Sequence, residues 1–240
     1  MEKEQFLSAI TEYSSSINVM LSEEQKEMFY EYMNILLEWN QKINLTTIIK
    51  PEDIIIKHFI DSLTVLKYIK NEKINVIDIG TGAGLPGIPI KIANESNNVT
   101  LLDSLNKRVV FLDNVINELK LKDIVAVHAR AEEYIKKEKR EIYDIAVSRA
   151  VANMSTLLEY LLPYLKINGI CVCMKGPNIE EELENSKKAL NILGGKIIKI
   201  DSFNLPDGSK RNIIIVKKIK NTPIKYPRKN NKPLKEPIFG

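Results

Sequence analysis

A glycine-rich turn that follows an apolar run constrains this 240-residue chain more than any other feature. The run at 74–79 leads directly into Gly80, Gly82, Gly84 and Gly87. Glycine adopts positive φ without strain and lets the backbone approach a ligand closely. A strand that ends in such a turn and continues into a helix is typical of α/β proteins that hold a nucleotide-like molecule. The sequence therefore predicts an α/β domain with a ligand site at the end of this strand.

Asp78, two residues before the turn, indicates which ligand is bound. A carboxylate at the mouth of a pyrophosphate-binding turn would face phosphates that are already anionic. S-adenosylmethionine carries a sulfonium and an ammonium against one carboxylate, so its net charge is positive. The spacing Gly82-x-Gly84-x-x-Gly87 also matches the dinucleotide fingerprint, which alone is a weak signal. Asp78 favours S-adenosylmethionine as the cofactor, and an NAD-dependent oxidoreductase is the alternative from another functional class.

Two further carboxylates follow the next two predicted strands. Asp103 ends the strand at 98–103, about 20 residues beyond the turn, where a carboxylate accepts both ribose hydroxyls. Its alternative role is to cap the helix that follows. After the strand at 124–128, the small Ala131 and the acidic Glu132 are placed to receive an adenine ring and its amino group. Three strand ends with acids favour a methyl donor over NAD.

Composition excludes several classes of protein. The chain is 44% hydrophobic, but it has no uncharged apolar run near the roughly 18 residues of a membrane span, so no membrane partner is expected. Cys171 and Cys173 alternate along an apparent strand, which indicates core positions, no disulfide framework and a reducing cytoplasm. His58 and His128 are far apart in the sequence, so no metal site is expected.

Positive charge gathers at the carboxyl end of the chain. The net charge is only +4, yet eight lysines and arginines and one acid follow residue 216. Prolines between them remove hydrogen-bond donors and discourage helix. The sequence predicts an extended basic arm at 221–240 that follows RNA phosphates, and a solvated tail without function is the alternative. The predicted RNA contacts in this arm are Lys225, Arg228, Lys229 and Lys232.

The rest of the chain divides into a helical extension at 1–70 and a domain at 71–220. Ser22 and Gln25 form a capping box, and apolar residues then follow at helical spacing. Pro51 suits the first turn of another helix. Short strands then alternate with helices, as in a parallel sheet. The expected strands are 74–79, 98–103, 124–128, 143–148 and 169–174, with an antiparallel pair near 195–203 and 211–219 closing one edge.

Arg149 follows the fourth expected strand, which should lie on the other side of the first one. Ligands of open α/β sheets bind at such a switch point, outside the carboxyl ends of the strands. Arg149 is therefore expected in the crevice, where it pairs with the donor's carboxylate or with an RNA phosphate. A surface salt bridge is the alternative.

A family resemblance extends over nearly the whole chain. Its motifs are Trp39-Asn40, 43–46, His58 with 61–63, the turn at 78–89, 102–104 with Lys107 and Arg108, 130–132, 148–152, Lys175-Gly176 and 226–228. Together they resemble the RsmG (GidB) family of bacterial small-subunit ribosomal RNA methyltransferases, which form 7-methylguanosine. The resemblance implies a class I, Rossmann-like, S-adenosylmethionine-dependent methyltransferase fold with a mostly parallel seven-stranded sheet.

The resemblance also implies site residues and a partner. The cofactor contacts that it implies are Gly80, Leu85, Ala131, Glu132 and Arg149, to which the turn and strand arguments add Gly82 and Asp103. The implied partner is small-subunit ribosomal RNA or the small ribosomal subunit, with Lys175 as a further RNA contact. A monomer is expected. The roles of Trp39, His58 and Asp61 stay open.

The chemistry of guanine N7 agrees with what the sequence lacks. N7 has an in-plane lone pair and no proton, so its methylation needs alignment rather than a general base. The chain has neither an Asn/Asp-Pro-Pro-aromatic motif nor a Pro-Cys nucleophile. No catalytic residue is assigned, and Arg149 is the best candidate, through positioning. A methyltransferase acting on another RNA or on a small molecule is the nearest alternative.

Overall fold

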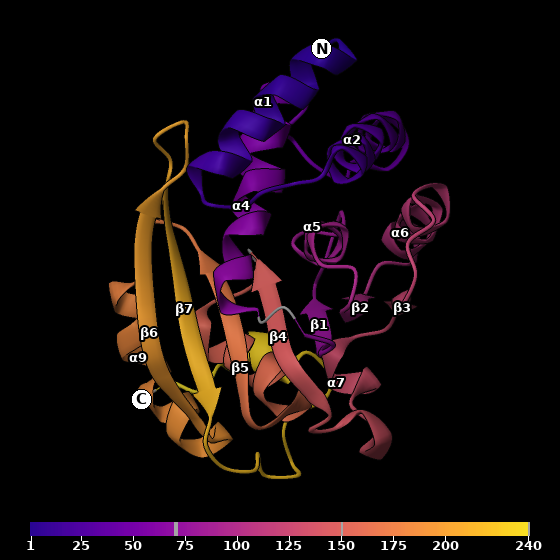
Figure 1. The fold of residues 1–240 in the computed structure, drawn as a ribbon. Coiled ribbons are helices and arrows are strands. Elements are labelled where there is room, and N and C mark those ends of the chain that lie inside the picture. The colour runs from indigo at the N-terminus through magenta and orange to yellow at the C-terminus, as the bar shows by residue number, and fades with distance from the viewer. Residues whose placement is uncertain (70–71, 150, 240) are drawn as a thin grey trace.

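A seven-stranded sheet forms the centre of the computed structural model, which describes residues 1–69, 72–149 and 151–239 (Figure 1). The strand order is β3-β2-β1-β4-β5-β7-β6, and neighbours from β3 through to β5 run parallel. β7 runs antiparallel to both β5 and β6. The prediction of a mostly parallel sheet with an antiparallel pair at one edge is confirmed.

Strand bounds agree closely with the apolar runs of the sequence. They are β1 Asn75–Ile79, β2 Asn98–Asp103, β3 Ile124–His128, β4 Tyr143–Arg149, β5 Leu165–Lys175, β6 Gly195–Asn204 and β7 Lys210–Lys218. Only β5 begins well before the predicted start at 169. Its first residues alternate between apolar and polar, and all from Lys166 to Asn168 are exposed, so no continuous apolar run marks them.

Helices cover both faces of the sheet and produce two cores. One face packs against α5 Gly87–Ala93 and α6 Asn106–Glu118, and the other against α8 Met154–Leu161 and α9 Glu180–Leu193, with the short α7 Ala131–Tyr134 near its edge. Neighbouring residues of a strand enter opposite cores, as Ile145 and Ala146 do. Cys171 and Cys173 are buried, unbonded and in the second core, as the alternation predicts.

The N-terminal extension (residues 1–69) is part of the first core. It begins with α1 Lys3–Ser16 and α2 Glu23–Ile43, and the capping box at Ser22 is present as predicted. Fully buried rings from three helical segments pack together there: Phe6, Phe29, Tyr32 and Phe59. These rings belong to the same apolar cluster as Val76 and Val147 of the sheet. The extension therefore folds as a layer of the domain.

A continuous helical segment from Pro51 to Tyr68 connects this layer to the site. It consists of α3 Pro51–Ile54, a π-helical turn Ile55–Ile60, α4 Asp61–Leu63 and a 3₁₀ turn Thr64–Tyr68. Pro51 occupies the first turn as predicted. The π-helical turn has no signal in the sequence, and such turns are frequent at functional sites.

The expected extended conformation of the C-terminal arm (residues 221–239) is wrong. The arm folds back onto α8. It contains one helical turn, α10 Lys232–Lys235, which tolerates Pro233 because this proline lies in the first turn. Tyr226 and Ile238 are buried in the second core, and the burial of these apolar side chains stabilises the folded-back arm.

Candidate functional site

The glycine-rich turn joins β1 to α5 in a conformation that needs its glycines. Gly80, Gly82 and Gly84 all have φ between 60° and 87°. A Cβ on Gly84 would lie 2.4 Å from Ile88 Cδ1 and 2.9 Å from the Tyr32 hydroxyl oxygen. The Tyr32 hydroxyl donates a hydrogen bond to the Ala83 carbonyl, so α2 supports the turn directly. The sequence stripe that contains Tyr32 indicates only a core position.

Asp78 holds the turn from inside. Its side chain is fully buried, and Oδ2 accepts hydrogen bonds from Thr81 Oγ1 at 2.7 Å and from Gly87 N at 2.8 Å. Burial raises the pKa of this carboxyl to about 6. The carboxylate therefore lies inside the turn and is not exposed at its mouth. Its Oδ1 is buried and accepts no hydrogen bond from the described residues, so a contact with the donor's positive charge stays a prediction.

Asp103 connects the turn to the start of α6. Its Oδ2 accepts from Gly82 N at 2.9 Å and its Oδ1 accepts from Leu105 N at 2.9 Å, with Arg108 Nη1 3.4 Å from Oδ2. A carboxylate has about four lone-pair sites, so these contacts leave capacity for a ribose hydroxyl. The alternative role as the cap of α6 is not seen, because the N-cap is Leu105 and no side chain caps the helix. The ribose contact of Asp103 stays a prediction.

A small cavity of about 170 Å³ brings three predicted cofactor residues together. Gly80, Ala131 and Glu132 line it, with Asn231 and Leu234 of the C-terminal arm on the opposite wall. Glu132 is buried, and its Oε1 accepts from Asn231 N at 3.2 Å. The arm thus occupies the acceptor that was predicted to receive an adenine amino group.

Three other predicted cofactor residues, Gly82, Leu85 and Asp103, line neither this cavity nor the larger one described below. Leu85 is the furthest from a ligand role. Its side chain is buried in the first core and lines neither cavity of this site.

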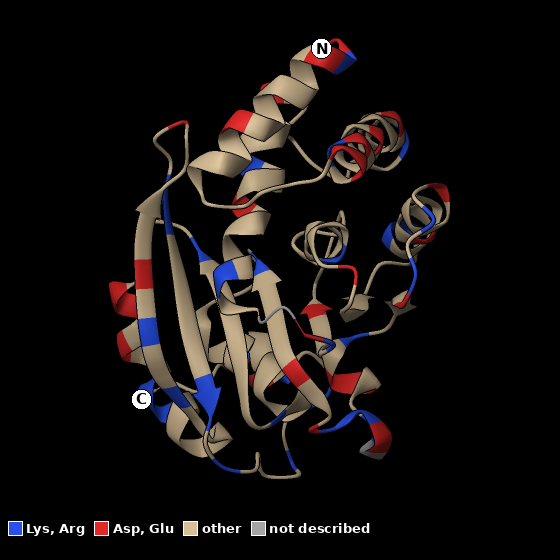
Figure 2. Ribbon diagram, viewed as in Figure 1, with Lys and Arg blue, Asp and Glu red and all other residues tan. Residues whose placement is uncertain are grey.

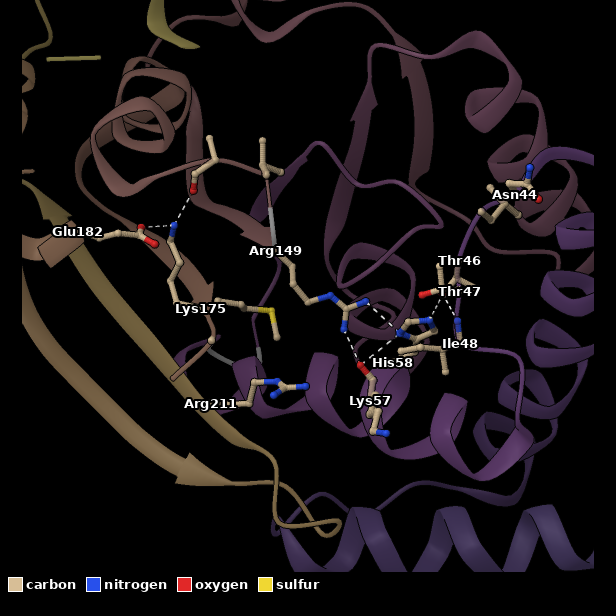
Figure 3. Close-up of a pocket in the computed structure, with 15 residues that line it drawn as sticks. Asn44, Thr46, Thr47, Ile48, Lys57, His58, Arg149, Lys175, Glu182 and Arg211 are labelled. Carbon is tan, nitrogen blue, oxygen red and sulfur yellow. Dashed lines mark hydrogen bonds and ion pairs between the residues drawn. The ribbon is translucent and has the colours of Figure 1, made fainter. Parts of the chain in front are cut away.

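A large cavity of about 920 Å³ lies between the N-terminal extension and the ends of β4, β5 and β7 (Figure 3). Arg149 lies on its wall, as predicted for the crevice, and its Nη1 is 2.9 Å from Asp61 Oδ2 and 3.0 Å from the Lys57 carbonyl oxygen. Val151 and Ala152 line both cavities, so the two spaces adjoin.

His58 is a neutral member of the large cavity. Its Nε2 lies 2.9 Å from Thr46 Oγ1 and its Nδ1 3.2 Å from the Lys57 carbonyl oxygen. Burial and the nearby charge of Arg149 lower its pKa to about 4, so the ring is uncharged near neutral pH. His58 therefore contributes polar atoms to the cavity as an uncharged ring.

Two of the predicted RNA contacts are engaged inside the protein. Lys175 Nζ bonds to the Ala152 carbonyl and to Glu182 Oε2, both at 2.6 Å, and its side chain is 9% exposed. Arg228 forms a two-pronged ion pair with the fully buried Glu159, with contacts from 2.7 Å. The sequence gives no sign of either partnership, because both partners approach only in the fold.

The other three predicted RNA contacts are exposed on the arm: Lys225, Lys229 and Lys232. Figure 2 shows lysines at the end of β7 and in the loop that follows, whereas acidic residues lie along α2. Part of this charge lies inside the protein, because Lys218 is fully buried and pairs with Glu141 at 2.6 Å.

None of the residues placed by the structure forms a group of three or more His, Cys, Asp and Glu that could hold a metal ion. No helix among the described residues combines the length and apolarity that crossing a bilayer requires.

Comparisons with known proteins give one consistent result. Residues 25–214 match the family model GidB, described as rRNA small subunit methyltransferase G. A protein of that name from Acetivibrio thermocellus is 54% identical over 95% of this chain and 95% of its own. One from Clostridium botulinum is 50% identical over 97% and 99%.

A solved structure supports the fold independently. The S-adenosylmethionine-dependent methyltransferase from Aquifex aeolicus superimposes with a TM-score of 0.52 at 19% identity, over 71% of this chain and 94% of that one.

Proposed function

The chain belongs to the GidB family of small-subunit ribosomal RNA methyltransferases, and from that membership we propose that it methylates N7 of a guanosine in this RNA. It is an S-adenosylmethionine-dependent methyltransferase with a class I, Rossmann-like fold. The observation that supports the proposed reaction most directly is the pair of adjoining cavities, which share Val151 and Ala152. One cavity is lined by residues predicted to hold the donor's adenine, and the other has room for an acceptor nucleotide.

The donor site that we propose starts in the small cavity. Gly80, Ala131 and Glu132 would hold the adenine end there, and Asp103 would accept from the ribose. Arg149, across the shared wall, would pair with the carboxylate of the methionine end. Ligand pockets usually measure about 300–1,000 Å³. At about 170 Å³ the small cavity falls below that range, so Asn231 and Leu234 would have to move aside when the donor enters.

S-adenosylmethionine supplies a methyl group on a sulfonium, which a ring nitrogen with a free lone pair can attack. The protein does not have to remove a proton from N7, which agrees with the neutral and buried His58. The residues around the large cavity would orient the guanosine and exclude water from it. Orientation of this kind can supply roughly 7–11 kcal/mol of the barrier.

The RNA surface that we propose includes the arm lysines Lys225, Lys229 and Lys232. We also propose that the enzyme acts as a monomer, on ribosomal RNA in the cytoplasm.

Nucleoside mapping by mass spectrometry tests this function. Small-subunit ribosomal RNA from cells lacking the protein should lose one 7-methylguanosine, and purified protein with S-adenosylmethionine should restore it. Comparing naked RNA with small subunits as acceptors identifies the substrate form. Intact methylation in the deletion strain would contradict the proposal. Methylation of a small molecule alone would favour the alternative substrate class.

A further inference from the structure

Arg211 is a cationic member of the large cavity that neither the motifs nor the proposed donor site uses. It lies at the start of β7, and its side chain is 25% exposed. Its Nη1 donates to the Lys210 carbonyl at 3.0 Å, and its Nε lies 3.4 Å from Asp61 Oδ1. Figure 3 shows Arg211 and Arg149 entering the same space from different strands.

The two arginines share one carboxylate. Asp61 is 3% exposed; its Oδ2 accepts from Arg149, while its Oδ1 is buried and accepts no hydrogen bond from the residues that the structure describes. The two lysines that line this cavity each form an ion pair with a separate carboxylate: Lys57 with Asp53, and Lys175 with Glu182. Because one negative charge faces two guanidinium groups, Arg149 and Arg211 retain one positive charge beyond what Asp61 neutralises.

Strand order indicates which anion each arginine can reach. Arg149 ends β4, beside β1 and its turn, whereas Arg211 lies two strands further along the order β1-β4-β5-β7. Adjacent strands are about 4.8 Å apart, so the two backbones are separated by roughly 10 Å at this edge. A donor whose adenine lies in the small cavity meets Arg149 first. Arg211 therefore faces a second anion.

We propose that Arg211 binds a phosphate of the acceptor nucleotide and so positions the guanosine in the large cavity. A planar guanidinium forms two parallel hydrogen bonds with a phosphate, a geometry that lysine cannot reproduce. Asp61 then has a positioning role, because it holds Arg149 for the donor and limits the reach of Arg211. The assignment rests on the proposed function.

Steady-state kinetics of Arg211→Gln test the assignment, with Lys210→Gln as the matched control. Lys210 is the exposed neighbour on the same strand, so it controls for the loss of one positive charge. We expect the KM for small ribosomal subunits to rise about tenfold or more in Arg211→Gln, because a charge-assisted bond is lost. Donor Kd by calorimetry should stay within about twofold, and Lys210→Gln should resemble the wild type. Arg211→Lys should recover part of the loss, since the charge remains without the fork.

Two results would overturn the assignment. An unchanged KM for the subunit in Arg211→Gln would show that Arg211 does not contact the acceptor. A weaker donor Kd with an unchanged KM would show that the anion is the donor's own carboxylate.

A binding measurement that needs no turnover separates this proposal from the proposed function. Guanosine 5′-monophosphate and guanosine are titrated by NMR into wild type and Arg211→Gln saturated with S-adenosylhomocysteine. Wild type should prefer the monophosphate several-fold, and the variant should bind both equally. Absence of a preference in the wild type, or its persistence in the variant, contradicts the role of Arg211. Failure of nucleoside mapping contradicts only the proposed reaction.

Discussion

The two ends of the chain cover the central domain in different ways. The N-terminal extension contributes fully buried rings, Phe6, Phe29 and Phe59 among them, to a core that continues into the sheet. The C-terminal arm buries much less: Tyr226 and Ile238 touch the second core, and Arg228 pairs with Glu159. Both ends nevertheless reach the site, one through Tyr32 at the turn and the other through Asn231 at Glu132.

This difference indicates how each end can move. Local opening is easiest where few apolar contacts are lost. The extension cannot detach without exposing the core of the domain, so it serves as fixed support for the turn and for Arg149. Opening the arm exposes fewer buried apolar side chains, chiefly Tyr226 and Ile238. We therefore propose the arm as the element that moves to admit the donor and contacts RNA.

The largest effect is expected from Phe59→Ala. Phe59 is fully buried, with ring centroids 5.1 Å from Phe29 and 5.2 Å from Tyr32. The cavity left behind should lower the free energy of unfolding by about 3–5 kcal/mol, measured by urea denaturation. The matched control on the arm is Phe239→Ala. Phe239 is 48% exposed, so this substitution should change the free energy of unfolding little. Equal losses in both variants would remove the distinction between the two ends.

Arg228→Met should have the next largest effect. It removes the guanidinium from the fully buried Glu159, which keeps the backbone N–H of residue 228 as a donor to Oε1 at 2.7 Å. The lost side-chain bonds should cost about 1–3 kcal/mol of stability. Limited proteolysis should cut the arm faster, while denaturation changes modestly. Lys229→Met, at an exposed neighbour, is the control. A loss as large as that of Phe59→Ala would mean that the arm is as integral as the extension.

Replacing Lys225, Lys229 and Lys232 together by Gln should weaken RNA binding without changing the melting temperature. Each lost phosphate contact flattens the log–log salt slope by roughly 0.7–0.9. The matched control replaces three exposed lysines of the extension, Lys3, Lys42 and Lys50, by Gln. An unaltered slope in the arm variant, or an equal change in the control, would contradict a separate RNA role for the arm.

The smallest effect concerns the pH dependence of His58 in the extension. Its pKa is lowered from 6.5 to about 4 by burial and by Arg149, so the unfolded chain binds a proton in that window that the folded protein does not. This contribution to stability is present above pH 6.5 and is lost as the pH falls towards 4.

The test compares melting temperatures near about pH 7 and about pH 5. The His58→Asn variant should show a smaller fall in melting temperature on acidification than the wild type. The His128→Asn variant, changed at an exposed histidine, should show the same fall as the wild type. Asp78, whose pKa is raised to about 6, acts in the opposite sense in every variant and cancels from the comparison. An identical fall in melting temperature in wild type and His58→Asn would contradict the claim that His58 is uncharged in the folded protein.

Much of the fold could be predicted because its signals are local. The apolar runs ending at Ile79 and Asp103 define their strands, and the capping box at Ser22 defines the start of α2. Half of the site follows the same logic: Gly80, Ala131 and Glu132 each lie just beyond a strand end, and parallel topology brings such ends together.

The sequence by itself thus determined the α/β class, the position of the turn and the strand ends that form the small cavity, because hydrophobic periodicity and glycine's freedom act over a few residues. Only the tertiary structure decided how charged groups pair. Arg149 meets Asp61 across 88 residues, and Arg228 meets Glu159 across 69. Asp78 turns inward, and Asn231 covers Glu132. A charged side chain is placed by whichever partner compensates its burial, and that partner is fixed only when the layers pack.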